Sequence, residues 1–301
     1  MKKHGILLLA GLMALTISLG ADELRLTVDA EARDIVAGFP IVLDVTLSTT
    51  GDATQLPVIS PGAGNVHVYI EDLRSGVKQR YLGPQWGIDE RAPELYAVTP
   101  DAPMRVAVPL LFHTVIEGRD DLAAAVLPFI PARYRLTVQY LDAGAAIPLS
   151  GSVDVVIREP DTRSERSYWD AMRADPYLAA SIQIGNFARH ADLLARAEEL
   201  VREHPDGAHA TVTGLAIGAH ALHVQRDARK AEAILQRASE LDANALLRSR
   251  IRYELASAQI ALEKFEEAAA TIESALSSAL DQGLSRDLLH LRGVLRRGAL
   301  P

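Results

Sequence analysis

The spacing of the apolar residues changes near residue 160, and this change constrains the fold more than any other feature of the chain. Before that point apolar and polar residues alternate, for example from Leu24 to Val28 and from Ile41 to Leu47. Beyond it, apolar residues recur at the longer spacing of a helix face. Alternation is the period of a half-buried strand, whereas spacings of three and four are typical of a helix. We therefore predict a β domain over residues 22–158 and an α-helical domain over residues 159–301.

The first half has the pattern of an antiparallel β-sandwich. Further alternating stretches predict strands at residues 66–70, 104–111, 134–140 and 153–157. Short strands with turn signals between them and no helical period are typical of two packed antiparallel sheets. The segment from Arg133 to Tyr140 resembles the penultimate strand of immunoglobulin-like domains, and Tyr134 stands where those domains form a tyrosine corner. This resemblance implies an immunoglobulin-like sandwich.

Two helical faces in the second half repeat one pattern of small and large apolar residues. The first face carries Ala231, Leu235 and Ala238, and the second carries Ala268, Ile272 and Ala275. The interval of 37 residues between Ala231 and Ala268 is a period of helical-repeat proteins. Asp175 followed by Pro176 predicts the start of a helix, and the Pro-Asp-Gly segment at 205–207 predicts the end of the next one.

At these positions the chain resembles the tetratricopeptide repeat family, in which pairs of antiparallel helices stack through small residues. The matching residues form three units: Ala180, Ser181, Leu193, Ala197, Leu200 and Pro205; then Gly218, Ala219, Ala228, Ala231, Leu235 and Ala238; then Leu255, Ala256, Phe265, Ala268, Ile272, Ala275 and Leu276. The chain departs from the family pattern where Leu222 and Gln259 replace the usual tyrosine, and it lacks the tryptophan of the first helix. The resemblance implies stacked helix hairpins closed by a capping helix over residues 284–297.

The first residues have the order of features that marks a secretory signal peptide. Lys2 and Lys3 are followed by an apolar run from Gly5 to Leu19 and then by small residues near position 20. Such a segment is removed during export. We therefore predict a signal peptide over residues 1–21 and a periplasmic or secreted protein of the bacterial envelope. An uncleaved membrane anchor is the alternative.

Composition narrows the classes of partner. The chain has no cysteine, so its domains must be held together by apolar cores and not by disulfides. Its formal net charge is −8, and loss of Lys2 and Lys3 with the signal peptide makes it −10. An acidic chain is poorly suited to bind nucleic acid. No later apolar segment is long enough to span a bilayer, so we expect neither nucleic acid nor a membrane span after signal cleavage.

The sequence lacks the motifs of familiar enzymes. It contains no Gly-x-Ser-x-Gly, no His-Glu-x-x-His and no phosphate-binding loop, and without cysteine it has no thiol nucleophile. His220 and His223 are three residues apart on a predicted helix, a spacing at which both imidazoles could reach a metal ion. No third ligand is identifiable, so we interpret the two histidines as polar groove residues. We expect a non-enzymatic protein with no metal and no cofactor.

The segment from Gly83 to Pro100 is long for a hairpin connection and contains Trp86 with several carboxylates nearby. Long loops often carry binding residues. Trp86 could stack on a sugar, which would make the chain a carbohydrate-binding accessory protein. The carboxylates could instead serve as the acid and base of an unfamiliar hydrolase. A third interpretation is structural, with Trp86 covering the end of the sandwich.

The resemblance to tetratricopeptide repeats gives the leading hypothesis for function. In that family the first helix of each pair lines a concave groove. The positions that match this groove are Leu178, Ile182, Asn186, His220, His223, Arg250, Tyr253 and Ser257. This mixture of aromatic, cationic and polar side chains suits a peptide or protein segment. We therefore predict an adaptor or scaffold that binds another envelope protein through the helical groove and the β-sandwich.

Overall fold

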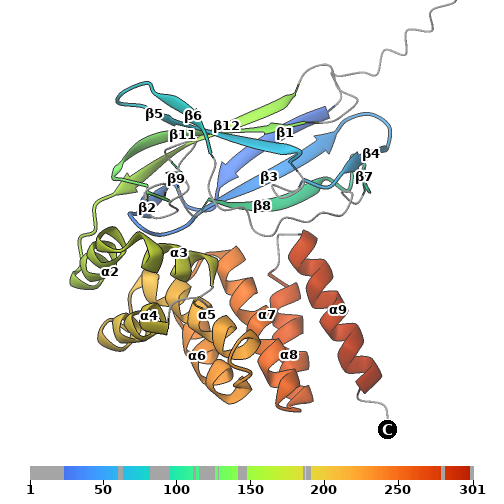
Figure 1. The fold of residues 1–301 in the computed structure, drawn as a ribbon. Helices are drawn as coiled ribbons and strands as arrows, with labels where there is room; N and C mark the ends of the chain where they lie inside the picture. The colour runs from blue at the N-terminus through green and yellow to red at the C-terminus, as the bar shows by residue number, and fades with distance from the viewer. Residues whose placement is uncertain are drawn as a thin grey trace, which may run out of the picture.

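The computed structural model of the protein describes residues 24–59, 64–81, 95–110, 113–114, 126–127, 129–141, 148–185, 187, 191–278 and 282–298. The predicted signal peptide lies outside the described residues. Strands end at Arg158 and helices begin at Arg163, so the predicted order of β followed by α is confirmed. The β region lies across one end of the helical region (Figure 1).

Two sheets make up most of the β region. The first has the order β1–β3–β8, from strands β1 (Leu24–Ala30), β3 (Ile41–Thr49) and β8 (Met104–Leu110). The second has the order β2–β12–β11–β5–β6, from β2 (Asp34–Val36), β12 (Leu149–Arg158), β11 (Ala132–Tyr140), β5 (Val66–Asp72) and β6 (Lys78–Arg80). Two short pairs join β4 (Thr54–Pro57) to β7 (Leu95–Val98) and β9 (His113–Thr114) to β10 (Val126–Leu127). Within the two larger sheets all pairs are antiparallel except β2 with β12, which is parallel.

Alternating apolar side chains from both sheets form one core. Ile41, Leu43 and Val45 of β3 are fully buried in it, and Leu136 and Val138 of β11 lie opposite in the same cluster. Alternation places every second side chain on the same face of a strand, so each sheet contributes one apolar face to the core. The strands predicted from alternation are therefore present, whereas β2, β4, β7, β9 and β10 are too short to give a pattern of their own.

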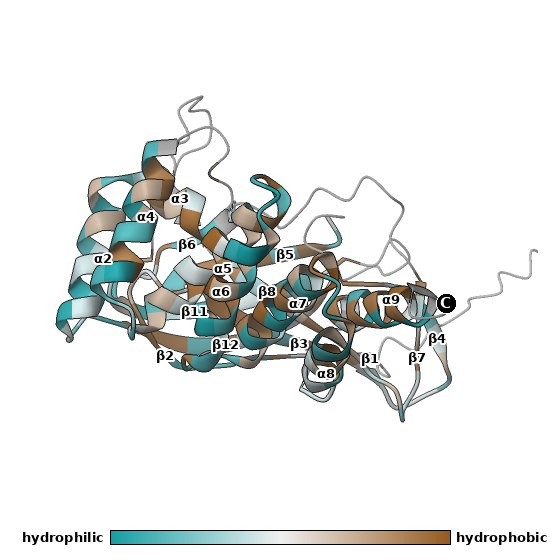
Figure 2. Ribbon diagram, turned by 90° about the horizontal axis from the view of Figure 1, so that it is seen from below, coloured by the Kyte–Doolittle hydropathy of each residue, from teal (hydrophilic) through white to brown (hydrophobic). Residues whose placement is uncertain are grey.

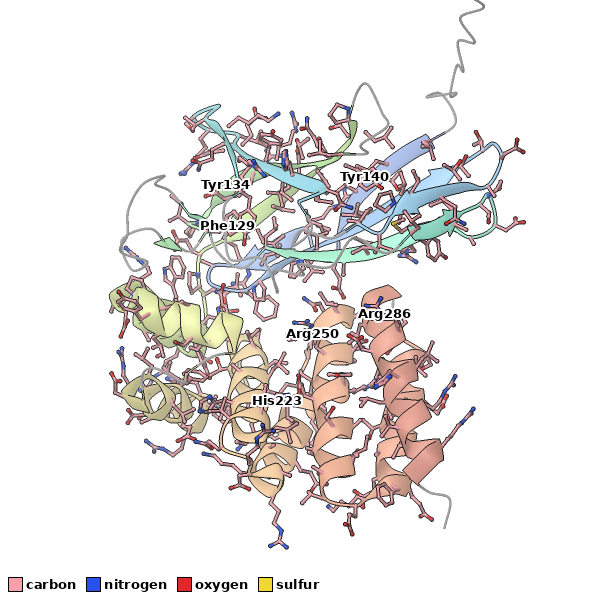
Figure 3. All side chains as sticks on the ribbon, turned by 45° about the vertical axis from the view of Figure 1, so that its right-hand side comes forward. Phe129, Tyr134, Tyr140, His223, Arg250 and Arg286 are labelled. Atoms are coloured by element: carbon pink, nitrogen blue, oxygen red, sulfur yellow. The ribbon has the colours of Figure 1, made fainter. Side chains whose placement is uncertain are left out.

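Tyr134 lies at the start of β11 and ties that strand to the chain just before it. Its phenol O–H donates a hydrogen bond to the backbone carbonyl of Ile130 at 3.0 Å. Phe129 packs edge-on against the Tyr134 ring with a centroid distance of 5.6 Å (Figure 3). Burial raises the pKa of Tyr134 to about 12, so the phenol stays protonated and keeps donating at neutral pH. A tyrosine bonded to backbone a few residues upstream is the contact predicted from the sequence.

The helical region contains eight helices among the described residues. They are α2 (Arg163–Ala174), α3 (Pro176–Ile184), α4 (Ala191–Glu203), α5 (Ala208–His223), α6 (Ala228–Glu240), α7 (Ala245–Ala261), α8 (Phe265–Leu276) and α9 (Gln282–Gly298). Seen from below, they extend from α2 at one side to α9 at the other and lie over the strands of the β region (Figure 2). The predicted closing helix is α9. None of the described helices has the length and apolar character of a membrane-spanning helix.

Helix starts follow the local signals in the sequence. Asp175 accepts hydrogen bonds from the backbone N–H groups of Tyr177 and Leu178, with Pro176 as the first residue of α3. An N-cap carboxylate satisfies donors that have no partner within the helix. The segment at 205–207 separates α4 from α5 as predicted.

Small residues let the helices of the second half approach each other closely. Ala231, Ala268 and Ala275 are fully buried. A Cβ added at Gly218 of α5 would lie 2.5 Å from Cγ of Leu235 on α6. Interiors at native density have no room for extra methyl groups. The repeated small residues therefore mark real helix-to-helix seams, of α5 with α6 and of α7 with α8.

The turn between β2 and β3 inserts into the helical region. We call the boundary between the β region and the helical region the seam, and this contact its sealed end. Gly38 has φ +84°, and a Cβ there would meet Met172 at 2.4 Å, Trp169 at 3.2 Å and His209 at 3.3 Å. The His209 Nε2–H donates to the Ala37 carbonyl at 3.1 Å. The Gln183 amide donates to the Gly38 carbonyl at 3.3 Å. These contacts fix the β region on α2, α3 and α5.

An ion pair ties the last strand to the first helix. The Arg158 guanidinium donates to both carboxylate oxygens of Glu165, at 2.6 and 3.2 Å. Glu165 also accepts the backbone N–H of Thr162, which caps α2 in return. Arg158 chiefly, together with backbone N–H donors, lowers the pKa of Glu165 to about 2. The carboxylate is thus charged and fully bonded where the β region gives way to the helices.

Candidate functional site

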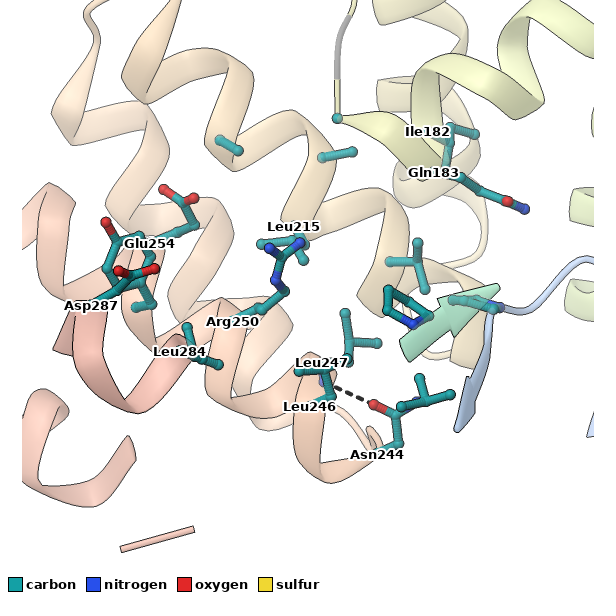
Figure 4. Close-up of a pocket in the computed structure, with 18 of the residues that line it drawn as sticks. Ile182, Gln183, Leu215, Asn244, Leu246, Leu247, Arg250, Glu254, Leu284 and Asp287 are labelled. Carbon is teal, nitrogen blue, oxygen red and sulfur yellow. Dashed lines mark hydrogen bonds between the residues drawn. The ribbon is translucent and has the colours of Figure 1, made fainter. Parts of the chain in front are cut away.

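A cavity of about 300 Å³ lies between the outer face of the first sheet and four helices, and we call it the open end of the seam. Its walls come from α3, α5, α7 and α9, which are the first helix of each hairpin together with the last helix. Its roof is the sheet. Figure 4 shows the side chains of these elements converging on one space. The cavity therefore forms only when both regions are present.

The roof is a cross-strand pair on the face of β3 and β8 that points away from the sandwich core. Val42 lies directly opposite Pro109, and both line the cavity. Pro40, just before β3, extends this apolar surface. Because neighbouring residues of a strand point to opposite faces, Ile41 and Leu43 enter the sandwich core while Val42 faces the helices.

The wall contributed by α5 is a continuous stripe. Val212, Leu215, Ala216, Ala219 and His223 line the cavity. Residues three and four positions apart share one face of a helix, so this spacing places all of them on the same side. The stripe is apolar over its first two turns and ends in a polar group at His223.

The wall contributed by α7 changes character in the same way. Leu246 and Leu247 lie near the sheet, while Arg250, Tyr253 and Glu254 lie further along the helix. Asp287 of α9 joins Glu254 at the polar end, and the Arg250 side chain points across the cavity toward Leu215 (Figure 4). The site thus has an apolar end beneath the sheet and a polar end away from it.

The polar end is held together by contacts between helices. The His223 Nε2–H donates to the Glu254 carboxylate at 2.7 Å, which links α5 to α7. The pKa of Tyr253 is raised, first by burial and then by the nearby carboxylates of Glu254 and Asp287, while Arg250 opposes the shift. The two carboxylates therefore outweigh the guanidinium in the electrostatic potential at the phenol oxygen.

Four of the predicted groove residues come together here, whereas His220 does not. His223, Arg250 and Tyr253 line the cavity, as does Ile182. His220 was expected on the same surface, but it is 5% exposed and packs edge-on against Phe187, with ring centroids 5.7 Å apart. Burial, with a contribution from Lys230, lowers its pKa. His220 thus belongs to the interior of the helical region, whereas the His223 side chain is about half exposed.

The remaining predicted site residues have other positions. Ser257 is half-buried on α7, where its hydroxyl donates to the Tyr253 carbonyl at 2.9 Å, and it lies beyond the cavity. Leu178 is fully buried in the helical core. Asn186 and Trp86 lie outside the described residues, so the sugar-stacking and hydrolase alternatives stay as predictions.

Two kinds of residue at the site were not predicted from the sequence. Glu254 and Asp287 are the carboxylates of the polar end, and Glu254 could have been found because it is four positions from Arg250 on the same helix face. Val42 and Pro109 could not, because nothing local indicates which face of a sheet meets a helix.

The described residues hold no group of three or more histidine, aspartate or glutamate side chains placed to bind a metal ion. The site is instead an apolar chamber with a hydrogen-bonding, charged end. Sites of this kind orient a ligand through a few polar groups and hold it through apolar contact.

Comparison with known proteins gives little further information. No protein-family model matches the chain, and no curated protein matches it in sequence. One solved structure with some likeness is that of Astrotactin-2, described as a conserved vertebrate-specific and perforin-like membrane protein involved in neuronal development. The likeness covers 74% of this chain and 38% of that chain, at 10% identity and a TM-score of 0.20. The chain thus spans well under half of that structure, and a likeness at this level carries no argument.

Proposed function

We infer that the protein is an exported, non-enzymatic adaptor that binds a segment of another envelope protein at the open end of the seam. The observation that carries this proposal is the cavity of about 300 Å³, in which His223, Arg250 and Tyr253 meet an apolar surface from both regions. Tyrosine and arginine are the residue types most often found as anchors at interfaces. A partially enclosed apolar chamber next to such residues can take a side chain from a partner.

The strand order supports an immunoglobulin-like identity for the β region. That fold has two packed sheets in which the first, second and fifth strands share one sheet and the last strands share the other. The orders β1–β3–β8 and β2–β12–β11–β5–β6 can be read in this way. The hydrogen bond from Tyr134 to Ile130 matches the tyrosine corner of the fold.

The seams and the cavity walls support a tetratricopeptide-like identity for the helical region. Small residues are buried where α5 meets α6 and where α7 meets α8. The first helices of the hairpins line the concave side, as that family would require. The departures at Leu222 and Gln259 leave these seams intact, since both residues are buried.

Export is part of the proposal and has a direct test. The native protein should begin within a residue of Ala21, and mass spectrometry of its N-terminal peptide measures this. A native chain that begins at Met1 or Lys2 would contradict export.

Site-specific photo-cross-linking tests the binding role. A photoreactive phenylalanine in place of Tyr253 keeps an aromatic ring at the cavity, and the same residue in place of Phe265, which is 38% exposed on α8, is the matched control. We expect position 253, and not position 265, to form an adduct with one envelope protein through a defined segment. Equal labelling from both positions, or none from position 253, would contradict the proposal.

Truncation of the anchors gives a second readout. The double variant Arg250→Ala and Tyr253→Ala should lose about 2 kcal/mol or more of binding free energy for that partner. Arg237→Ala, exposed on α6, is the control. Unchanged capture by the double variant would show that this surface is not used.

A further inference from the structure

The two ends of the cavity differ in chemistry, and this difference indicates what kind of segment would fit. The class of ligand inferred from this difference rests on the proposed binding function. Val42, Pro109 and Leu247 surround the end beneath the sheet, where none of the described lining residues is charged. An apolar side chain placed there leaves water for an apolar environment, which is favourable in proportion to the area buried.

The opposite end carries a net negative character. Glu254 is 18% exposed and Asp287 is 54% exposed at their side chains, and both line the cavity. His223 binds one Glu254 oxygen at 2.7 Å, and Arg286 is 4.0 Å from Asp287, at the limit of an ion pair. A carboxylate accepts at two oxygens and about four lone-pair sites, so these contacts from the described part of the chain do not fill the acceptor positions of either group.

The raised pKa of Tyr253 also indicates that the polar end favours a cation. The two carboxylates act on its phenol more strongly than the Arg250 guanidinium does, although Arg250 also lines the cavity. A cationic group placed beside the phenol is therefore attracted, and an anionic group is repelled. Charge complementarity of this kind gives specificity more than raw affinity.

We propose that the cavity recognises a protein segment with an apolar side chain followed closely by a lysine or arginine, the apolar group entering beneath Val42 and Pro109 and the cation binding Glu254 and Asp287. Such a ligand contacts both regions of the molecule, so it also stabilises their seam.

Selection from a phage-displayed library of random peptides on the purified mature protein tests the ligand class. We expect the enriched peptides to share an apolar residue next to a basic residue. The best peptide, made synthetically, should lose about tenfold in affinity when its basic residue is changed to glutamine, and again when its apolar residue is changed to alanine. Its affinity should fall as salt increases.

Protein variants locate the two contacts. Asp287→Asn combined with Glu254→Gln should weaken the synthetic peptide about tenfold, whereas Glu240→Gln, exposed on α6, should not. Ala219→Leu narrows the cavity from α5 and should reduce peptide affinity by a similar factor. Ala233→Leu places the same change on the exposed face of α6 and is the control. Melting curves of all variants verify that they are folded.

Several results would overturn this inference. They are enrichment of acidic or purely apolar peptides, absence of any enriched peptide, and affinities that the carboxylate variants leave unchanged. If the Tyr253 cross-link to a native partner forms while the selected peptides lack a basic residue, the ligand class is wrong and the binding site stands. If the cross-link fails while apolar-basic peptides bind at the cavity, the ligand class stands and the adaptor role fails.

Discussion

The sealed end and the open end of the seam use the same two regions of the chain in opposite ways. At the sealed end the turn around Gly38 is packed so closely that an added methyl would lie 2.4 Å from Met172. At the open end Val42 and Pro109 face a cavity of about 300 Å³. Filling both ends would bury more apolar surface and stabilise the fold further. The difference fits a molecule in which one end sets the position of the regions and the other is kept for a ligand.

The sealed end is tested most strongly at Gly38. Gly38→Ala introduces a Cβ where φ is +84°, where the Met172 methyl must move and where the Trp169 ring is 3.2 Å away, so we expect a loss of about 2 kcal/mol in unfolding free energy. Gly76→Ala is the matched control, since Gly76 has φ +68° but no atom within 4 Å of an added Cβ. It should cost about 1 kcal/mol from backbone strain alone. Equal losses in urea titrations would mean that the sealed end is loosely packed.

The walls of the open end depend on the helix seams behind them. Ala268 of α8 is fully buried against α7, the helix that carries Arg250 and Tyr253. Ala268→Leu should cost about 2 kcal/mol through overpacking, measured as a lower melting temperature. Ala269→Leu, on the exposed side of α8, should change it little. If both variants melt like the wild type, the proposed seam is wrong.

The ion pair at the junction gives a smaller effect that depends on pH. Glu165→Gln keeps a side-chain oxygen that can accept the Thr162 backbone N–H at the start of α2, but it removes the charge that Arg158 binds. The pKa of Glu165 is lowered to about 2, so its contribution is complete above the unfolded value of 4.5 and is lost as pH falls through the folded value. We expect a loss of about 1.5 kcal/mol at neutral pH, allowing for solvent screening at the half-exposed Arg158.

The check is a series of urea titrations from pH 7 toward pH 2. The stability difference between wild type and Glu165→Gln should shrink as the carboxylate is protonated. A difference that stays constant across this range would assign the effect to altered packing and not to the ion pair.

The smallest expected effect is at His209 in the sealed end. Burial chiefly lowers the pKa of His209, whose ring is stacked on Tyr168 with centroids 5.4 Å apart and lies edge-on to Phe39. Glu165 and Arg158 act on it with opposite signs. The neutral ring is therefore favoured in the folded state. Its contribution is complete above pH 6.5 and is lost as pH falls through the folded value.

His209→Gln keeps a donor for the Ala37 carbonyl but does not titrate. We expect its stability to fall less steeply than that of the wild type between pH 6.5 and 5, as measured by urea titration. Parallel pH profiles would show that protonation of His209 does not weaken the sealed end.

Features that depend on neighbours in sequence were predictable. The alternation of β3 and β11 predicted their buried faces, and Asp175 with Pro176 predicted the start of α3. Tyr134 bonds the Ile130 carbonyl, only four residues away, and this contact was implied by the resemblance to immunoglobulin-like domains. In each case the period of the backbone or a short hydrogen bond decides the outcome, and both are encoded locally.

The difference between His220 and His223 depends on contacts between elements, which the sequence pattern of one helix does not predict. The two residues lie about 60° apart around α5, close enough for one concave surface by helical geometry alone. Phe187, from the connection between α3 and α4, covers His220, while His223 reaches Glu254 on α7. The period of a helix gives the angle between two side chains but not which neighbouring element lies against each of them.

The sequence by itself therefore determined the order of β followed by α, the main strands and helices, the small-residue seams, and four residues of the cavity wall. Only the tertiary structure decided that Val42 and Pro109 roof that wall, that Glu254 and Asp287 meet at its polar end, and that His220 is buried. The physical reason is that periodicity fixes the orientation of side chains within one element. The distance and angle between elements come from packing at contacts such as Gly38 with Met172, which join residues far apart in the chain.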